Sequence, residues 1–519
     1  MSTPPAARLP VESVDLRLVP SALAAWFGAL VAVLASRAVV LAVGGTAVLG
    51  AGGLVVAALR GRGARPEGRG ARPDGRAAAW GADRHLATAF LAIGVLLTVL
   101  VGGSVLGHGR SSGLLAEAVS EGATATVRGV VVGQPVEVDA RWSSDQPHVR
   151  MVVEVRCVEA RGRRGPAHAT VEVLAPGAAA SVGAVVEVTG RLRPADGAAD
   201  RAAGALDAVR PFSVVAAPTG LTGWHATVTA GAGKVASRIG GDAGALLLGV
   251  AIGDTSRVDA GLAAAMRTAG LTHLTAVSGA HFAIVGSVVA AAAGACRLPR
   301  AGRAAAVLVA GALLFWLVGA QPSVLRAAVM GLIGVAGLLA GRPARAPAAL
   351  SAAIVVLLVG DPWLATEVGF VLSVLATASI VLLGRAWVER WSARLGPGLA
   401  GALAVPLAAQ LACGPVLLAI RPDVSSYAVL ANLAVAPAVG PATVLGVLTA
   451  AVAPVWPSGA LVMGHLAGAA CWWIAVVART VAAAPGADTA WAPGFVGILA
   501  LAGAGVATTA LLLRTGPPA

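Results

Sequence analysis

Polar side chains that could bind a ligand or transfer a proton are concentrated in one otherwise apolar stretch, Ala251–Gly286, which reads AIGDTSRVDAGLAAAMRTAGLTHLTAVSGAHFAIVG. Its second half is apolar enough for a bilayer, yet it contains five polar residues: Thr272, His273, Thr275, Ser278 and His281. Polar groups in hydrocarbon are costly unless they are hydrogen-bonded or face water. The stretch therefore either lines a polar path through a membrane or joins helices through Ser and Thr hydrogen bonds. The two histidines favour the path.

The spacing of three of these residues predicts a common face. If 275–281 is helical, Thr275, Ser278 and His281 recur at intervals of three residues and lie on one side of the helix. His273 then points largely away, unless the Ser278-Gly279 step breaks the helix. Ser278 and His281 could also serve a membrane hydrolase, but A-V-S-G-A is not a nucleophile elbow and no oxyanion or base geometry is suggested. We therefore predict no catalytic residues.

Two further polar residues interrupt apolar segments downstream. Arg326 follows Pro322 early in its segment, where its guanidinium could contact a phosphate group or extend to lipid headgroups. Asn432, close to Pro437, could line a break in a membrane helix or form a hydrogen bond between helices. The predicted lining of the path is Thr275, Ser278, His281, Arg326 and Asn432.

Several other chemistries are absent from the sequence. The GAGKV segment around Lys234 lacks the leading Gly and the Ser or Thr of a phosphate-binding loop, so we expect no ATP-driven motor. There is no HExxH or HxHxDH motif, and the four cysteines form no CxxC pair. We therefore expect no metal or other cofactor, and a driving force that comes from another protein or a gradient.

The composition is that of an integral membrane protein. Of 519 residues, 57% are hydrophobic and only 12% are charged, and the mean hydropathy is +0.82. Apolar runs predict a polytopic α-helical protein of about twelve transmembrane helices, three within 1–106 and the others in a channel domain at 271–513. Residues 223–270 are expected to form an interfacial amphipathic segment, because charged residues such as Arg257 and Arg267 are spaced among small apolar ones.

Residues 107–222 differ from their surroundings. Five short runs rich in Val, Thr and Glu, such as HVRMVVEVRCVEA, are divided by Pro- and Gly-rich turns and predict a small all-β, OB-like domain. Such a domain can bind single-stranded nucleic acid through basic grooves and stacking aromatics. Because acidic and basic residues balance here and aromatics are few, a spacer or gate is the alternative. The candidate DNA-binding residues form one basic cluster: Arg156, Arg161, Arg163 and Arg164.

The distribution of arginines predicts the orientation. The net charge of +13 could suggest nucleic acid, but in a membrane protein basic residues first indicate which loops are cytoplasmic. An Arg- and Gly-rich loop at 60–84 could likewise bind nucleic acid, although a disordered cytoplasmic loop is the simpler interpretation. This loop and the basic connections at 297–303, 342–345 and 385–394 are expected in the cytoplasm, with the OB-like domain outside.

Four stretches in a fixed order resemble one known family. They are GDTSRVDAGLAAAMRTAGLTHLTAVSGAHFAIV, then QPSVLRAAVM at 321–330, DPWLATEVGFVLSVLA at 361–376, and AAQLACGPVLL followed by YAVLANLAVAP within 408–437. They are similar to the ComEC family, the competence DNA-uptake channel of the bacterial inner membrane. The third stretch of that family commonly has Gln where this sequence has Val371, so no role is carried over to Val371.

The resemblance implies an inner-membrane protein that moves single-stranded DNA into the cytoplasm during natural transformation. It also implies a separate DNA receptor and a cytoplasmic motor. A separate nuclease is implied as well, because the zinc signature of the metallo-β-lactamase-like domain found in many relatives is absent. That domain is thought to degrade the strand that is not transported. From the residues alone, a small-molecule or ion transporter with broken helices is the alternative, and the oligomeric state is not indicated.

Overall fold

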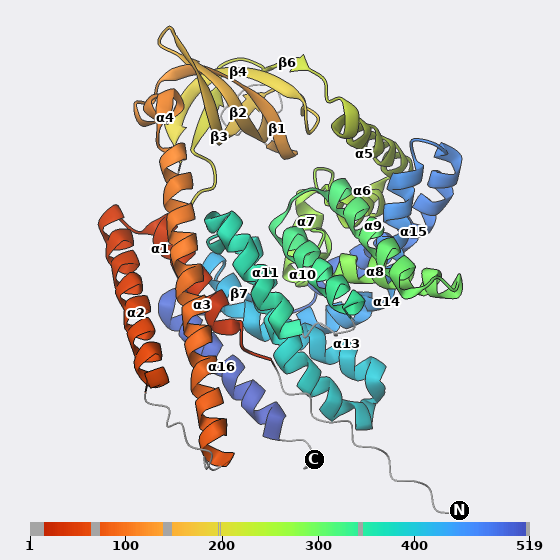
Figure 1. Cartoon of the computed structure of the whole chain (residues 1–519). Helices are drawn as coiled ribbons and strands as arrows, with labels where there is room; N and C mark the ends of the chain where they lie inside the picture. The colour runs from red at the N-terminus through yellow and green to blue at the C-terminus, as the bar shows by residue number, and fades with distance from the viewer. Residues whose placement is uncertain are drawn as a thin grey trace, which may run out of the picture.

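The computed structural model describes residues 15–63, 73–138, 148–195, 197, 199–340 and 346–514. It has two parts, an all-β domain and a larger helical part, which α3 (Pro73–Arg110) and α5 (Gly220–Ile239) connect (Figure 1). The centre of the predicted Arg-rich loop, at 64–72, and the basic connection at 342–345 lie outside the described residues.

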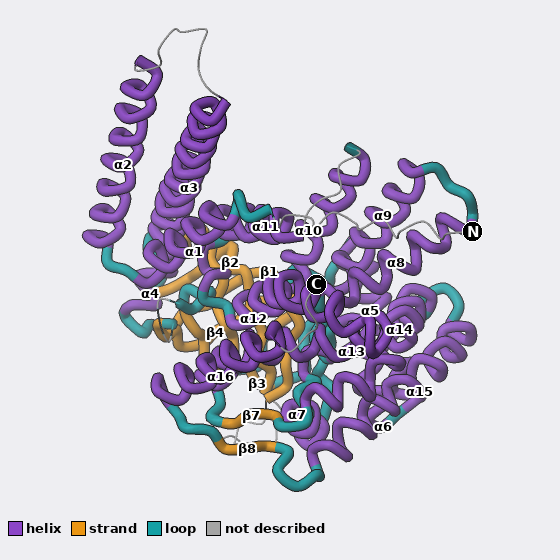
Figure 2. Tube along the Cα trace, turned by 90° about the horizontal axis from the view of Figure 1, so that it is seen from below, coloured by secondary structure: helices purple, strands orange, loops and turns teal. Residues whose placement is uncertain are grey.

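The N-terminal helices are α1 (Val19–Leu34), α2 (Arg37–Gly63) and α3. Trp26 of α1 stacks on Phe370, with ring centroids 5.4 Å apart, so α1 is joined to the downstream helices. Helices α2 and α3 extend into the region that the sequence predicts as a loop, since Ala and Arg favour helix and proline suits the first helical position. Figure 2 shows the α2–α3 pair projecting from one side of the molecule.

The β-domain contains α4 (Gly113–Ser120) and six strands: β1 (Thr124–Val138), β2 (His148–Ala160), β3 (Arg163–Pro176), β4 (Val185–Pro194), β5 (Gly204–Ala208) and β6 (Ser213–Ala216). Strand β1 pairs with both β2 and β4, and β3 pairs in parallel with β5, so five strands close on themselves in the order β1-β2-β3-β5-β4. Alternate residues point inward, and Met151 and Leu206 are fully buried in the core against which α4 packs.

One strand of this domain is not predicted by the sequence. Strand β5, GALDA, is short and lacks the β-branched and aromatic residues that favour strands. Antiparallel pairing with β4 and parallel pairing with β3 hold it in place. Its conformation is therefore set by its neighbours in the sheet, so local sequence patterns do not reveal it.

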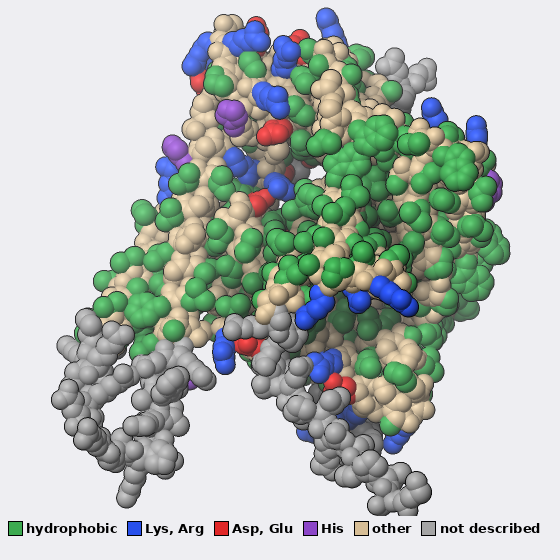
Figure 3. Space-filling model, turned by 45° about the vertical axis from the view of Figure 1, so that its right-hand side comes forward, with side chains coloured by type: hydrophobic (Ala, Val, Ile, Leu, Met, Phe, Trp, Pro, Cys, Tyr) green, Lys and Arg blue, Asp and Glu red, His purple; other side chains and the backbone are tan. Residues whose placement is uncertain are grey.

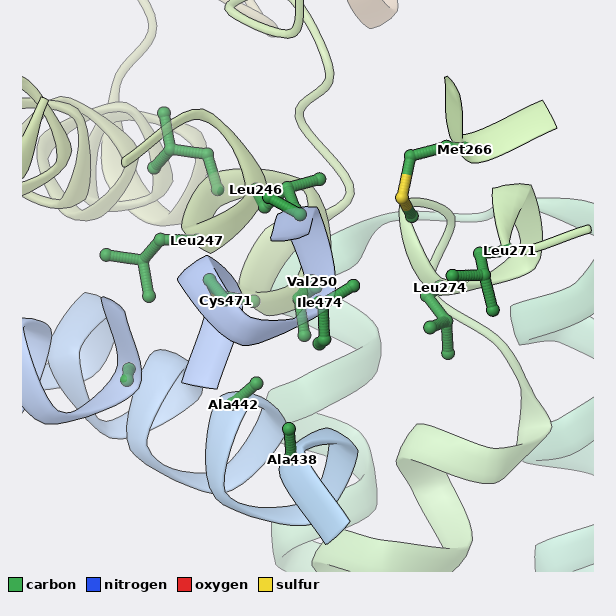
Figure 4. Packing of buried hydrophobic residues seen from close by; sticks show 14 of the residues in the cluster. Leu246, Leu247, Val250, Met266, Leu271, Leu274, Ala438, Ala442, Cys471 and Ile474 are labelled. Atoms are coloured by element: carbon green, nitrogen blue, oxygen red, sulfur yellow. The ribbon is translucent and has the colours of Figure 1, made fainter. Parts of the chain in front are cut away.

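Helix α6 (Gly241–Ile252) is buried inside the helical part. Every residue from Gly244 to Ile252 is buried, among side chains of α5, α7 (Ala260–Thr268), α14 (Ala428–Val452) and α15 (Pro457–Ala482). Figure 4 shows Val250 of α6 and Ile474 of α15, which belong to the same buried cluster. This position differs from the interfacial one expected for 223–270, because the many Gly and Ala residues let α6 pack closely between other helices.

The remaining elements complete the helical part: η1 (Thr272–Leu274), α8 (Gly279–Ala295), α9 (Arg300–Val318), α10 (Pro322–Leu339), α11 (Ala346–Gly360), η2 (Pro362–Ala365), α12 (Val368–Ser379), the π-helical η3 (Ile380–Gly384), α13 (Arg385–Ile420), β7 (Asp423–Ser425), β8 (Asp488–Ala490) and α16 (Gly494–Arg514). Within the described ranges, eight helical segments are long and apolar enough to cross a membrane, and four shorter helices are also apolar. Hydrophobic side chains cover much of the helical surface in Figure 3, whereas charged ones gather at the end that holds the β-domain and in a second band near the opposite end. The chain is thus a helical membrane protein, and the count of about twelve crossings stays a prediction.

Candidate site at the start of helix α8

The chain is not helical between η1 and α8. Ser278 has extended backbone angles (φ −126°, ψ 175°) and is the N-cap of α8, which begins at Gly279. The common face of Thr275, Ser278 and His281 required a helix over 275–281, so it does not form. The chain instead breaks at the Ser278-Gly279 step, which the sequence left open as the alternative. Ser is a favoured N-cap residue, because its side-chain oxygen can satisfy N–H groups that lack a partner in the first turn. The Ser278-Gly279 step thus interrupts the apolar stretch at its most polar point.

His281 and Ser278 together cap α8. The backbone N–H of Ser278 donates to His281 Nδ1 at 3.0 Å, and Ser278 Oγ lies 3.1 Å from the same nitrogen. Since a backbone N–H can only donate, Nδ1 is an acceptor and the neutral ring carries its proton on Nε2. His281 is 1% exposed, and Nε2 is buried without a hydrogen-bond partner in the described part of the chain. The cap therefore leaves one buried donor free.

Arg326 lies in the first turns of α10 and reaches this same point. Its side chain is 6% exposed, with Nε donating to Ser373 Oγ on α12 at 2.8 Å and Nη1 to Met330 Sδ at 3.2 Å. A Cβ atom added to Gly279 would lie 3.0 Å from Arg326 Nη2, so the absence of a side chain at Gly279 lets the guanidinium approach the backbone closely. The guanidinium therefore lies inside the protein, which favours an internal role over contact with lipid headgroups.

A side-chain hydrogen bond holds α10 against the segment that leads into α8. Ser323 Oγ, one turn before Arg326, donates to the carbonyl oxygen of Val277 at 2.9 Å. Thr275 is buried, and its Oγ1 donates to the carbonyl oxygen of Thr272 at 2.8 Å. The structure thus brings Ser278, His281 and Arg326 together, with Thr275 on the segment that leads to them.

Asn432 does not belong to this cluster. Its Nδ2 donates to the carbonyl oxygen of Ala428 in the preceding turn of α14, at 2.8 Å. Two residues of the cluster, Gly279 and Ser373, are not predicted as site residues by the sequence. A polar residue in the apolar run of α12 is a signal that could have indicated Ser373, whereas the role of Gly279 depends on a contact between distant helices.

The arginine cluster of the β-domain lies at the β2–β3 turn. Arg161 and Gly162 both have positive φ, as a two-residue hairpin turn requires. Arg161 Nη1 lies 2.8 Å from Glu121 Oε2, and Arg163 Nη1 lies 3.2 Å from Glu117 Oε2, so α4 and the residue that caps its end supply carboxylates to two of the arginines. Arg164 Nε donates to Cys157 Sγ, a hydrogen bond that raises the pKa of the guanidinium, and Arg156 is exposed on β2. The cluster is therefore partly neutralised.

The cluster at α8 lies in the part of the chain that is similar to known proteins. A family model described as "Competence protein" matches residues 250–516, a range that includes all the residues around Arg326. ComE operon protein 3 of Bacillus subtilis (strain 168) is 29% identical over 211 residues, which are 40% of this chain and 26% of that protein. The chain thus matches about a quarter of the length of this relative. No solved structure matches the chain.

Proposed function

Because the chain belongs to the competence protein family, we propose that it acts in DNA uptake and that its helical part passes single-stranded DNA across the bacterial inner membrane. The observation that carries the proposal is that three of the four stretches similar to the ComEC family meet at the polar start of α8. Ser278 and His281 come from the first, Arg326 from the second and Ser373 from the third. Each phosphate is a charge that hydrocarbon excludes, so a strand needs a continuous polar path with donors and cations along it.

We propose the same residues as the lining of the path, with Asn432 set apart from the others. Ser278, His281 and Arg326 lie at the interruption between η1 and α8, where irregular backbone at membrane depth can line a polar cavity. Thr275 lies on the segment that leads to this interruption. Asn432 stays a proposed lining residue, although its hydrogen bond is made within α14 and gives no support to that role. None of them is proposed to make or break a bond, because the contact of Ser278 with His281 is that of a helix cap.

For the β-domain we favour an OB-like fold with a spacer or gate role. The closed order β1-β2-β3-β5-β4 and the parallel β3–β5 pair support the fold assignment. The carboxylates of α4 beside Arg161 and Arg163 argue against a strong DNA-binding surface at the arginine cluster. Figure 1 shows the β-domain at the C-terminal end of α3 and the end of α2 near the opposite, N-terminal end of α3. This supports an outside position for the domain and a cytoplasmic one for the ends of α2 and α3 that lie away from it.

The remaining parts of the uptake system belong to other proteins in this proposal. A separate receptor delivers the DNA, a cytoplasmic motor supplies the driving force and a nuclease degrades the second strand. A small-molecule or ion transporter is the competing function, and dependence of transport on DNA separates the two.

Replacing Ser278 or His281 with Leu tests the path directly. A bulky apolar side chain at the interruption should block the strand, so nuclease-resistant DNA inside the cell should fall at least about tenfold, a barrier change of about 1.4 kcal/mol. Membrane insertion should be retained, because added hydrophobicity favours it. Since loss of the cap at Ser278 should also lower stability by about 1 kcal/mol, uptake is expressed per molecule of inserted protein. Labelled DNA in the cytoplasm, DNA bound at the surface and protein level are measured on the same cells.

Ser287→Leu is the matched control for this test, since Ser287 is an exposed residue of α8. It should change neither uptake nor abundance. If the polar residues only joined helices, the Ser278 and His281 variants would lose abundance in step with uptake, because such bonds are worth about 0.6–2 kcal/mol. Normal abundance with normal uptake in both would refute the path.

A further inference from the structure

Arg326 carries a charge that the described residues do not neutralise. Its two hydrogen-bond partners, Ser373 Oγ and Met330 Sδ, are uncharged, and its side chain is buried. The salt bridges found within the described ranges do not include it. A buried ion without a counter-ion is strongly unfavourable. An anion in contact with Arg326 would remove this penalty.

The N-terminus of α8 adds partial positive charge beside Arg326. The first N–H groups of a helix lack partners within it and give the N-terminus a partial positive charge. Arg326 Nη2 lies against Gly279 in this turn, and among the hydrogen bonds of the described chain none is donated by the N–H of Gly279 or Ala280. A cation beside a helix N-terminus is unfavourable unless an anion lies with them.

A third donor is present in the same turn of α8. His281 Nε2 carries the proton of the neutral ring, because Nδ1 accepts from the backbone N–H of Ser278. This donor is buried and has no partner in the residues that the structure describes. Buried polar groups nearly always have a partner, so an unpaired buried donor indicates an acceptor that the chain does not supply.

We infer that these groups form a binding site for one phosphodiester group of the DNA strand. Arg326 Nη2 and the N–H groups of Gly279 and Ala280 supply its donors, and His281 Nε2 is a further one. The inference rests on the proposed function and deepens it by naming what the path binds at this point. Ala280 is exposed, which leaves one side of the turn accessible to the strand.

The hydrogen bonds of Arg326 suit a phosphodiester group that must bind and then be released. A strand in transit needs contacts that are favourable enough to enter and weak enough to release. Neutral acceptors fix Nε and Nη1 while leaving the positive charge and Nη2 for the phosphate. A lysine could not satisfy Ser373 and Met330 and still present a donor at Gly279, because its charge is a single compact ammonium.

The test uses the full chain in lipid nanodiscs and a short labelled single strand of thymidines. Affinity is measured against salt concentration for the unaltered chain and for Arg326→Gln. Arg326→Gln should weaken binding at low salt by about tenfold, as expected for the loss of a hydrogen bond to a charged group. The slope of log affinity against log salt should decrease by about 0.7, the contribution of one phosphate contact on single strands.

Three comparisons separate a phosphate site from a structural role of Arg326. Ser373→Ala removes the anchor of Nε but keeps the charge, so it should retain the salt slope even if it lowers thermal stability. Arg300→Gln, on the exposed start of α9, is the matched control and should leave affinity and slope unchanged. A strand with uncharged methylphosphonate linkages should bind the unaltered chain no better than the normal strand binds Arg326→Gln.

The outcomes distinguish this inference from the proposed function. An unchanged salt slope in a folded Arg326→Gln protein overturns the phosphate site, whether or not Ser278→Leu blocks uptake in cells. Millimolar inorganic phosphate that displaces the strand completely would assign the site to free phosphate and also overturn it. Normal DNA uptake without the gene overturns the proposed function itself, independently of any binding result.

Discussion

A single arginine joins three helices at the interruption before α8. Arg326 contacts Ser373 on α12, Met330 on its own helix and Gly279 at the start of α8. Polarity in an apolar background is enough to select Ser278, His281 and Arg326 from the sequence. Which atoms they use could not be predicted, because the expected helical face at 275–281 depended on a helix that the Ser278 cap interrupts. Gly279 was missed because its importance lies in a contact made across the fold.

The ion pairs at the β2–β3 turn predict that the arginine cluster contributes little to the affinity for single-stranded DNA. Because Glu117 and Glu121 already pair with Arg163 and Arg161, replacing Arg161, Arg163 and Arg164 together with Gln should change single-strand affinity of the full chain by no more than about fivefold. Removing the carboxylates, with Glu117→Gln and Glu121→Gln, should instead raise the affinity by freeing two guanidinium groups.

Fluorescence anisotropy at low and moderate salt measures both changes. Exposed charges are screened by salt, so a gain in the carboxylate variant should disappear as salt increases. A large, salt-sensitive loss of affinity in the arginine variant would contradict the spacer role and assign DNA binding to the arginine cluster.

Short helices separated by glycines form the element that presents the site. Gly253 (φ +75°) ends α6, and Gly270 (φ +68°) separates α7 from η1. The sequence predicts a polar, interrupted stretch here, and its long apolar helices are recognisable from hydropathy. The burial of α6 was not predictable, because a Gly- and Ala-rich segment with nearby charges suits an interface as well as a helix–helix contact.

Gly270→Ala should destabilise the protein at this element. A side chain is strained at positive φ, and the new Cβ would lie 2.6 Å from Ala428 Cβ at the start of α14. The expected loss is about 1–3 kcal/mol, measured as a lower midpoint of thermal unfolding in detergent. Gly311→Ala is the matched control, because Gly311 has open space around it in α9. It should have no effect or raise stability by up to about 1 kcal/mol. Equal midpoints for the two variants would contradict the strained turn.

At the scale of the whole molecule, a charged β-domain stands at one end of an apolar helical body (Figure 3). Helix α3, with 38 residues, is about 57 Å long, and its C-terminal end reaches the β-domain. Composition alone predicts a membrane protein with one small β-domain. It cannot predict that α6 packs against α14 and α15, because an apolar side chain suits contact with lipid as well as contact with a neighbouring helix.

We propose that this chain carries DNA across the membrane. The most direct measurement follows radiolabelled double-stranded DNA in cells with the gene deleted and with it restored, and counts nuclease-resistant single strands in the cytoplasm. Deletion should abolish this internal label while DNA bound at the cell surface stays normal, and the restored gene should recover it. Internal label that is the same with and without the gene would contradict the account.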